Sequence, residues 1–600
     1  MRNVVAAVVL GVIAAGAVHA GESGETILDE TSPFRCHYTW RTPVVGSGSD
    51  LRAFPGRGNT LLCHTPMPPN TWREPDFDDG SWSRWPGPAI EAVQARERAR
   101  GAVKYNHGVG SYPWEPFQDT VSPCLALLCM RGRFRVTDPR DMRLSVTHRG
   151  GVAVYVNGKE IARAHLPRGE VGLDALAEGY PQEAHLGTNG KPFAFYRSAW
   201  RRVGGDERMP LRLRRLKDVI VPSSVLRKGI NVLALEIHRA PHHRRAVNWG
   251  TCGPVKVDLR AAGGAEPNVS RPSGVQVWNC NWKTIITPLD YGDPAEPLRP
   301  IEIVGARNGI FTGRIVVSSD GSLRGVKAVM SDLAPAEGSS GIPASAARIL
   351  YAGLHDEKGR ESRGKRFDPL ADRPPREITP LKSPRGEFRG GAVQPIWIKL
   401  RIPAEARPGT YRGRLTLSVG GGRSVEVPVH LQVIDWKLPD PRQFETHMAL
   451  VQSPESVALQ YKVPLWSQRH WQLLEKSFEL LGEVGNRYVC IPLICRTNFG
   501  NAESMVRWIK GQGPGVRGQG AGERDPNATP DTRHPTPDPY THDFSVFDRY
   551  LDLARKHLRL DVVCLYGWDL YCGRLSWGST RVAGATGPKV SLLDPGSGKV

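Results

Sequence analysis

The spacing of apolar residues changes part-way along this chain, and that change limits what the chain can fold into. Before residue 438, apolar and polar residues alternate in short runs such as Met142–Thr147, the period of two that is typical of half-buried β-strands. Beyond it, apolar residues take up helical spacing, at Trp471, Leu474, Phe478 and Leu481. The chain also has many turn residues, with 65 glycines and 50 prolines. The sequence therefore predicts β domains followed by an α/β domain.

The first residues predict export. Arg2 precedes the apolar run Val4–Val18, and Ala20 ends a small-residue site, which is the order of a cleaved signal peptide. An uncleaved N-terminal anchor is the alternative. We expect a secreted or periplasmic (extracytoplasmic) protein with no transmembrane segment after the signal peptide. The predicted segments are 1–20 (signal peptide), 25–265 (jelly roll), 266–437 (β-sandwich) and 438–600 (α/β).

Residues 25–265 predict a sandwich or jelly roll of short strands. Asn157-Gly158 between two β runs is a strong hairpin signal, because both residues tolerate positive φ. Four pieces in order resemble a galactose-binding-like jelly roll, the accessory module of many glycosidases: Trp72, Phe77–Trp82, Val154–Gly158 and Gly229–Leu235. An insertion carries aromatic residues that either line a sugar site or pack against the sandwich: Tyr180, Phe193, Phe195, Tyr196 and Trp200.

Residues 266–437 show alternating runs and no helix of ordinary length, which predicts a second β-sandwich. Its motifs resemble the N-terminal β-sandwich attached to catalytic domains of glycoside hydrolase family 123: Ala306-Arg307-Asn308, Phe367–Leu370, Trp397, Ile402–Gly413 and Val433–Pro439. We expect Pro408-Gly409 to form a turn between two antiparallel strands and Gly413 to allow a close backbone approach.

Residues 438–600 alternate strand-like and helical runs, which predicts βα units and a parallel sheet. The strand-like runs are Glu445–Val451, Arg487–Ile494 and Leu560–Tyr566. Three strands do not complete a (β/α)8 barrel, so we expect the chain to stop inside one. Met505–Lys510 and Asp543–Tyr550 resemble the start of a family 123 catalytic domain. The expected fold is multidomain: two all-β sandwich or jelly-roll domains, then the N-terminal part of a (β/α)8 barrel.

The resemblance implies a glycoside hydrolase, a retaining β-N-acetylhexosaminidase similar to β-N-acetylgalactosaminidases, and the signal-peptide pattern predicts that it is exported. Such enzymes use the substrate's own acetamido oxygen as nucleophile, with an adjacent Asp-Glu pair to orient it and to act as acid and base. The Asp-Glu neighbours Asp29-Glu30, Asp206-Glu207 and Asp356-Glu357 all precede the barrel region. We therefore assign the catalytic role to none of them and expect the pair beyond Val600.

Active sites of barrels form at the C-terminal ends of the strands. The residues that follow the predicted strands are the candidate substrate-binding residues: Gln452, Arg496, Asn498, Trp568 and Asp569. A tryptophan there would stack under a sugar ring. Packing or loop capping is the alternative role for each of the five.

The net charge and the cysteine count limit which partners and which disulfides we expect. The net charge of +20 is scattered and no nucleic-acid reader motif accompanies it, so we expect no nucleic acid; binding of anionic glycans is a weaker alternative. The expected partner is an oligosaccharide, polysaccharide or glycoconjugate, with no cofactor and no metal. A non-catalytic carbohydrate-binding or cell-envelope protein of the same fold is the alternative function. One or two disulfides are expected among the first six cysteines: Cys36, Cys63, Cys124, Cys129, Cys252 and Cys280.

Overall fold

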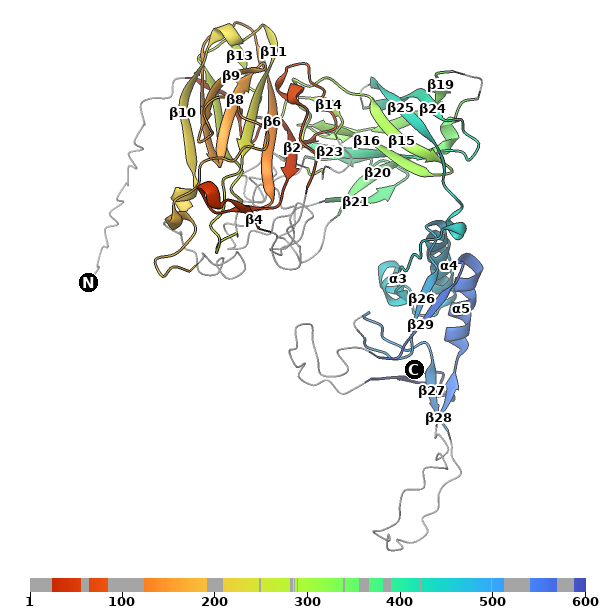
Figure 1. The fold of residues 1–600 in the computed structure, drawn as a ribbon. Helices are drawn as coiled ribbons and strands as arrows, with labels where there is room; N and C mark the ends of the chain where they lie inside the picture. Colours follow the sequence, from red (N-terminus) through yellow and green to blue (C-terminus); the bar gives the residue numbers. More distant parts are fainter. Residues whose placement is uncertain are drawn as a thin grey trace, which may run out of the picture. The chain divides into compact units, whose positions relative to one another are not determined.

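The computed structural model describes residues 24–54, 64–84, 123–191, 209–247, 250–280, 284, 286–288, 290–337, 340–355, 366–380, 390–420, 422–497, 499–511, 540–568 and 588–600. The protein is mostly β-structure with few helices (Figure 1). It divides into two units, Met1–Trp436 and Lys437–Val600. The signal-peptide prediction, residues 1–20, lies outside the described residues, and so do Phe193, Phe195, Tyr196 and Trp200.

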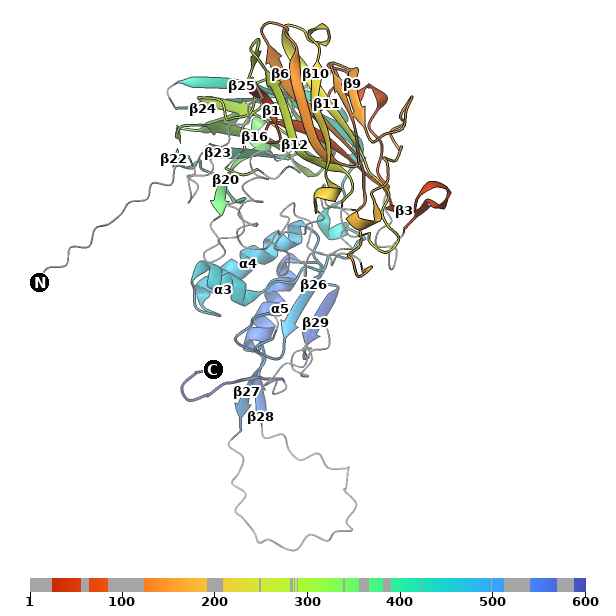
Figure 2. The same cartoon turned by 90° about the vertical axis from the view of Figure 1, so that its left-hand side faces the viewer.

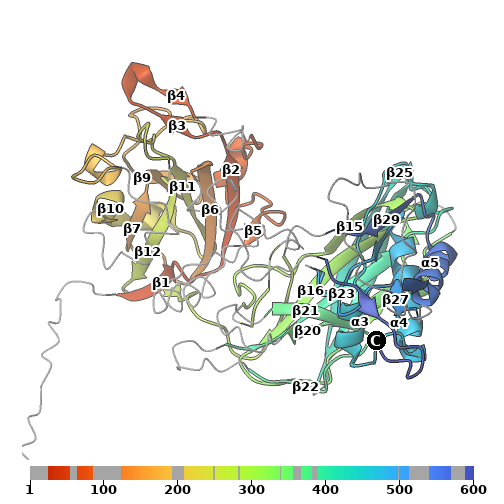
Figure 3. The same cartoon turned by 90° about the horizontal axis from the view of Figure 1, so that it is seen from below.

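The first β-sandwich of the first unit consists of two antiparallel sheets packed face to face (Figure 3). One sheet has the order β1 (Glu25–Asp29), β12 (Gly253–Ala261), β7 (Met142–Arg149), β10 (Arg214–Val221). The other has the order β5 (Ser83–Arg84), β2 (Phe34–Trp40), β6 (Leu125–Val136), β11 (Gly229–His238), β8 (Gly151–Val156), β9 (Lys159–Ala164), with β13 (Ala265–Glu266) beside β6. Alternate side chains from both sheets form the core, among them Leu144, Val146, Val154, Leu235 and Leu259.

The predicted Asn-Gly hairpin is confirmed. Asn157 and Gly158 connect β8 to β9 with φ of 49° and 83°, the pair of positive values that a type I′ turn requires. The Asn157 side-chain Nδ2 also donates to the Asn231 Oδ1 at 2.8 Å. The turn is thereby fixed to β11 as well as to its own strands.

The histidines and aromatic residues around this sandwich have structural roles. Trp72 is fully buried against Trp82 and Tyr155. His238 is also buried, and its Nε2 lies 2.9 Å from the Glu236 carboxylate. Among the insertion aromatics, Tyr180 accepts a hydrogen bond from the Gly150 amide at 2.8 Å. It therefore packs the insertion against the sandwich, the second of its two expected roles.

The second β-sandwich has the strand content that the alternating runs predict. One sheet has the order β14 (Val275–Trp278), β16 (Ile310–Ser319), β23 (Ala392–Arg401), β20 (Ala347–His355), β21 (Arg366–Ala371). The other has the order β15 (Ile301–Arg307), β25 (Arg423–Lys437), β24 (Gly409–Val419), β18 (Lys327–Met330), with β19 (Ala334–Pro335) on β24. Two short pairs complete the first unit: β17 (Leu323–Arg324) with β22 (Glu377–Ile378), and β3 (Val44–Val45) with β4 (Arg52–Ala53).

The expected role of Pro408-Gly409 was wrong in one respect. The segment does not join two paired antiparallel strands, because β23 lies in one sheet and β24 in the other. It is an arch between layers, and the buried Tyr411 fixes it by donating from its hydroxyl to the Arg407 carbonyl at 2.9 Å. The close approach at Gly413 is confirmed, since a Cβ there would lie 2.8 Å from the Asp332 carbonyl oxygen.

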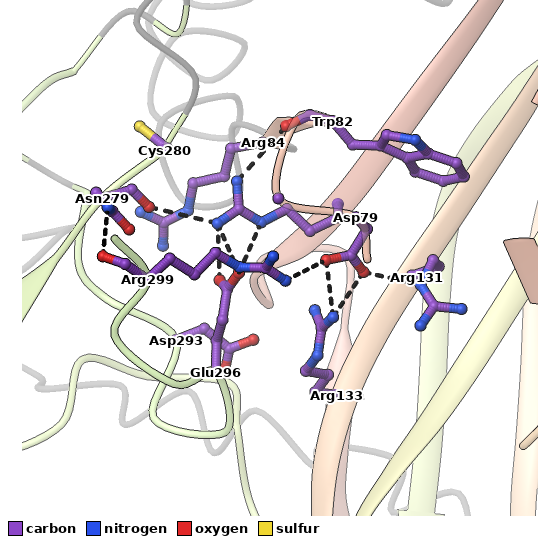
Figure 4. A network of polar contacts seen from close by, with 12 residues as sticks. Asp79, Trp82, Arg84, Arg131, Arg133, Asn279, Cys280, Asp293, Glu296 and Arg299 are labelled. Carbon is purple, nitrogen blue, oxygen red and sulfur yellow. Dashed lines mark hydrogen bonds and ion pairs between the residues drawn. The ribbon is translucent and has the colours of Figure 1, made fainter. Parts of the chain in front are cut away.

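Buried charges link the two sandwiches of the first unit (Figure 4). The Asp79 carboxylate is fully buried and binds Arg131 at 2.8 Å and Arg133 at 2.7 Å, both on β6. Arg299, which precedes β15, reaches the same carboxylate at 3.0 Å. We call these four residues the Asp79 cluster. The one carboxylate accepts hydrogen bonds from all three guanidinium groups, and the bond from Arg299 crosses the junction.

A second carboxylate extends this cluster. Glu296 binds Arg299 at 3.1 Å and accepts a bidentate contact from Arg35, with 2.7 Å to the nearer oxygen. Arg35 comes from β2 of the first sandwich, whereas Glu296 lies in the segment that leads into the second. The segment between the two sandwiches is therefore anchored at several points instead of acting as a free linker.

In its described residues, the second unit combines a short parallel sheet with three α-helices. Its helices are α3 (Pro454–Tyr461), α4 (Gln468–Glu483) and α5 (Ser545–His557). Strands β26 (Tyr488–Pro492) and β29 (Val562–Tyr566) pair in parallel (Figure 2). A small sheet has the order β28 (Tyr540–Asp543), β27 (Arg507–Lys510), β30 (Ser591–Leu592). The helices pack on the strand pair through Leu474, Phe478, Val489, Ile491 and Tyr550.

The expected strand at Glu445–Val451 was wrong. A single parallel bridge, Met448 to Asn486, is the pairing that the structure gives this segment. The Asn486 side chain takes the place of further ladder bonds, because its Oδ1 accepts from the Leu450 amide at 2.8 Å. Helix α3 follows directly, capped by the Ser453 hydroxyl, and the sequence patterns missed it. The parallel βα arrangement is present, while a (β/α)8 barrel stays a prediction.

Two further expectations concern the cysteines and the membrane. The buried Cys36, Cys129 and Cys252 are thiols, as is Cys280, so the expected disulfide does not join any two of these four; Cys63 lies outside the described residues. Within the part of the chain that the structure describes, no helix has the length and apolarity needed to span a bilayer.

Candidate functional site

The C-terminal edge of the parallel pair is where the sequence predicts a site. β26 ends at Pro492 and β29 at Tyr566. The Leu493 amide donates to the Tyr566 carbonyl at 3.0 Å, so the segments that follow the two strands separate only beyond this point. The Phe499 ring contacts the Tyr566 ring at 4.9 Å. Loops that leave adjacent parallel strands together form the usual ligand-binding edge of such sheets.

The loop after β26 has a defined conformation because Asn501 holds it from within. The Asn501 Oδ1 accepts from the Thr497 amide at 3.1 Å and from its hydroxyl at 2.6 Å. The Asn501 Nδ2 donates to the Ile494 carbonyl at 2.8 Å and to the Glu503 carbonyl at 2.9 Å. A side chain that is 2% exposed and fully bonded makes this loop a rigid support for its exposed residues.

Arg496 is the exposed cation on this support. Its φ is +58°, in the left-handed region that non-glycine residues seldom adopt. Its amide donates to the Asn501 carbonyl at 2.8 Å, which holds this conformation in place. Backbone strain that the surrounding structure maintains is found most often at functional sites.

Two carboxylates lie under the loop, and both are used to hold it. Glu455, in the first turn of α3, accepts from backbone amides that include those of Ala502 and Glu503. Burial raises the pKa of Glu455, and the nearby charge of Glu503 adds to the rise. Glu503 in turn accepts from the Trp466 indole at 3.2 Å and from Arg507 at 3.0 Å. These hydrogen bonds fix the loop to α3 and leave the two carboxylates poorly placed for acid–base chemistry on a ligand.

Two of the predicted site residues follow the ends of the two parallel strands. Arg496 and Trp568 both lie just beyond the edge, in the loops that follow β26 and β29, and the Trp568 side chain is 58% exposed. The Gln452 Oε1 accepts from the Tyr550 hydroxyl of α5 at 3.0 Å, while its buried Nε2 has no hydrogen-bond partner among the described residues. Asn498 and Asp569 lie outside the described residues. The substrate-binding role of the five stays a prediction.

Sequence reasoning missed the residues that shape the edge, Asn501 and Glu455. The Ser453-Pro454-Glu455 run is a helix-start signal that would have revealed α3, but no sequence pattern marks Asn501. The arrangement can bind and orient a polar ligand through a guanidinium and an indole face. Across the described residues, no group of three or more His, Cys, Asp or Glu side chains is placed to hold a metal ion.

Family models match the chain at two places. Residues 305–419 match the glycoside hydrolase 123 N-terminal domain, and residues 452–519 match the glycoside hydrolase 123 catalytic domain. The chain is a family 123-like protein. The first match covers most of the second sandwich of this family 123-like protein. The second runs from Gln452 through α3, α4, β26 and β27 and so includes the Arg496 loop.

Solved structures give weaker likenesses. A family 123 glycoside hydrolase from Clostridium perfringens, studied for glycolipid glycan hydrolysis, is 17% identical with a TM-score of 0.35; the match covers 48% of the family 123-like protein and 46% of that enzyme. A calcium-binding mutant of Bacteroides uniformis β-glucuronidase 2 is 10% identical with a TM-score of 0.16, over 79% of this chain and 44% of that one. The family 123-like protein thus spans less than half of each enzyme. No curated protein matches it.

Proposed function

We propose that the family 123-like protein is an exported glycoside hydrolase, a retaining β-N-acetylhexosaminidase of the β-N-acetylgalactosaminidase kind. The observation that carries this proposal is the order of the two family matches, N-terminal domain at 305–419 and catalytic domain at 452–519. The parallel pair β26–β29 with helices packed on it agrees with the N-terminal part of a (β/α)8 barrel. In this proposal a jelly roll at 25–265 and a sandwich at 266–437 precede the barrel.

The proposed chemistry is substrate-assisted. The acetamido oxygen of the sugar attacks its own anomeric carbon while an acid protonates the leaving group, and water then opens the cyclic intermediate, so that configuration is retained. In this scheme Trp568 supports the apolar face of the sugar ring and Arg496 donates to its oxygens. We assign no catalytic carboxylate within residues 1–600, and these two residues are proposed for substrate binding only.

A paired assay tests the proposed reaction. The protein as its gene encodes it is given an aryl β-N-acetylgalactosaminide and the matching aryl β-galactoside. Because the 2-acetamido group supplies the nucleophile, we expect turnover of the first with retained configuration and almost none of the second. Equal turnover of both, or turnover of the galactoside alone, would exclude substrate assistance.

A tryptophan comparison tests the proposed edge. Trp568→Ala should raise KM more than it lowers kcat, because an indole platform binds ground state and transition state alike. Trp436→Ala is the matched control, since Trp436 is 57% exposed at the end of β25 and Trp568 is 58% exposed. An unchanged KM in Trp568→Ala, or an equal change in both variants, would remove Trp568 from the site.

Two outcomes decide the remaining parts of the proposal. Binding of N-acetylgalactosamine-containing glycans without hydrolysis would favour the carbohydrate-binding or cell-envelope alternative, which the absence of an assigned catalytic carboxylate keeps open. Export predicts that the N-terminus of secreted or periplasmic material begins at or near Gly21. A mature chain that still begins at Met1 would contradict cleavage.

A further inference from the structure

Two cysteines that are far apart in sequence lie side by side in the second unit. The parallel register of β26 and β29 places Cys490 directly opposite Cys564. Val489 and Ile491 belong to the core under the helices. Since successive side chains of a strand point to opposite faces, Cys490 and Tyr488 lie on the face away from that core.

The side chains of these residues are in contact. The Tyr488 hydroxyl interacts with the Cys490 and Cys564 sulfurs, and the two sulfurs interact with each other. Cys490 is 4% exposed, whereas Cys564 is only partly buried. Within the described residues, Cys564 is the more exposed thiol of the pair and Cys490 is the enclosed one.

The spacing suits a covalent bond. Neighbouring strands lie about 4.8 Å apart, which is within the range of roughly 4.4–6.8 Å between the Cα atoms of bonded cysteines. In an in-register parallel pair the Cβ atoms lie about as far apart as the Cα atoms, slightly beyond the roughly 3.5–4.5 Å of a disulfide. Bond formation therefore needs a small approach of the two strands as well as side-chain rotation. In the first sandwich the buried Cys36 lies opposite Met130, and the buried Cys129 lies opposite His37 and Glu236.

We propose that Cys490 and Cys564 form a redox-active pair that closes to a disulfide between β26 and β29. The accessible Cys564 thiolate attacks a sulfur of a disulfide oxidant, such as oxidised glutathione, and displaces one thiolate. The Cys490 thiolate then attacks Cys564 in the mixed disulfide and displaces the second. Two thiols are oxidised, one oxidant disulfide is reduced to two thiols, and the two cysteine protons pass to the released thiolates or to solvent.

The environment of Cys490 sets the slow step. Burial raises the pKa of Cys490 to about 11, and the neighbouring Cys564 adds to the rise, while the Tyr488 hydrogen bond opposes it. Because the thiolate is the attacking species, ring closure should be slower than capture of the oxidant and should accelerate as the pH rises. Tyr488→Phe should slow closure further without preventing it.

Mass spectrometry of the full-length protein tests the proposal. The folded chain is equilibrated in glutathione buffers of increasing oxidation, free thiols are alkylated, and proteolytic peptides are mapped. We expect one peptide pair joined through Cys490 and Cys564, lost on treatment with dithiothreitol. Cys490→Ser should accumulate a glutathione adduct on Cys564, whereas Cys564→Ser should leave Cys490 largely alkylated. The matched control Cys495→Ser, which removes a buried cysteine of the adjacent loop, should keep the cross-link.

Several results would overturn the proposal. One is wild-type protein in which both cysteines are still alkylated after equilibration in fully oxidising buffer and denaturation. Another is a cross-link that joins either cysteine to a different partner. Equal glutathione capture by Cys490 and Cys564 in the two serine variants would overturn the order of attack. The wild-type map decides the bond itself even if a serine variant fails to fold.

Discussion

Asp79→Asn is the sharpest test of how the two sandwiches are joined. The substitution keeps the shape of the side chain and removes its charge from the centre of three guanidinium groups at 2.7, 2.8 and 3.0 Å. The Asp79 side chain is fully buried, so solvent cannot replace the lost partner. Removing one partner of a buried charge network costs about 3–5 kcal/mol. With about 2–4 °C per kcal/mol for a domain of this size, the melting transition of the first unit should fall by about 6–20 °C.

Differential scanning calorimetry of the whole chain would measure this effect. The transition of the second unit should stay in place and serves as an internal reference. Asp78→Asn is the matched control, because the neighbouring Asp78 also contacts Arg299 but its side chain is 81% exposed, and exposed pairs contribute about 0–1 kcal/mol. Equal shifts in the two variants, or a shift below about 2 °C in Asp79→Asn, would refute the claim that burial makes this cluster strong.

The lowered pKa of Asp79 also predicts how the stability of the first unit depends on pH. Burial opposes ionisation of Asp79, but Arg133 and Arg131 outweigh it and lower the pKa. A carboxylate with a lowered pKa in the fold contributes stability above its ordinary pKa, and that stability is lost as the pH falls below it. Acid should therefore destabilise wild-type protein more than Asp79→Asn. An identical acid profile for both would contradict the assignment.

Three further substitutions test other features. Burial, followed by the charge of Glu296, raises the pKa of Asp293 from 3.8 to about 6. Stability from this group is therefore present at low pH and is lost as the pH rises through about 6, by at most about 3 kcal/mol. Asp293→Asn should flatten this dependence of the unfolding free energy on pH, measured by urea titration at several pH values. Gly413→Ala places a Cβ 2.8 Å from the Asp332 carbonyl oxygen and should cost about 1–3 kcal/mol in urea unfolding, whereas Gly321→Ala, with a nearest contact at 3.9 Å, should be close to neutral. Tyr550→Phe removes the hydroxyl that donates to Gln452 at 3.0 Å and should lower the urea midpoint of the second unit by the equivalent of about 0.5–1.5 kcal/mol, with an unchanged slope.

The local patterns of the sequence predicted the strands well. Alternation found β7, the strand-like apolar runs found β26 and β29, and helical spacing found α4, because a buried or half-buried strand or helix leaves its pattern in the sequence. Asn157-Gly158 likewise specified its own turn. What alternation does not contain is the partner of each strand, so Pro408-Gly409 was assigned to a hairpin although it connects two sheets.

The candidate site was harder to predict for a related reason. Following the strands to their ends led to Arg496 and Trp568, whose substrate-binding role stays a prediction, and to Gln452, whose Oε1 accepts from the Tyr550 hydroxyl of α5. The strand expected at Glu445–Val451 is absent, because the Asn486 side chain takes the place of backbone–backbone hydrogen bonds by accepting from the Leu450 amide. The Cys490–Cys564 pair depends on register alone, and register is set by tertiary packing, which no local motif records.

The pairing of β1 with β12 has a consequence for the order in which the first sandwich can form. Glu25 pairs with Ala261 and Asp29 with Asp258, so β1 has no partner on β12 until nearly the whole region 25–265 has been synthesised. The hairpin of β8 and β9 can close early, since it needs only the Asn157-Gly158 turn. Contacts between residues this far apart in sequence make folding slow, and the loop entropy must be lost before they form. The edge position of β1 is thus the last to be filled, and until then β12 presents an open strand to other chains in the cell.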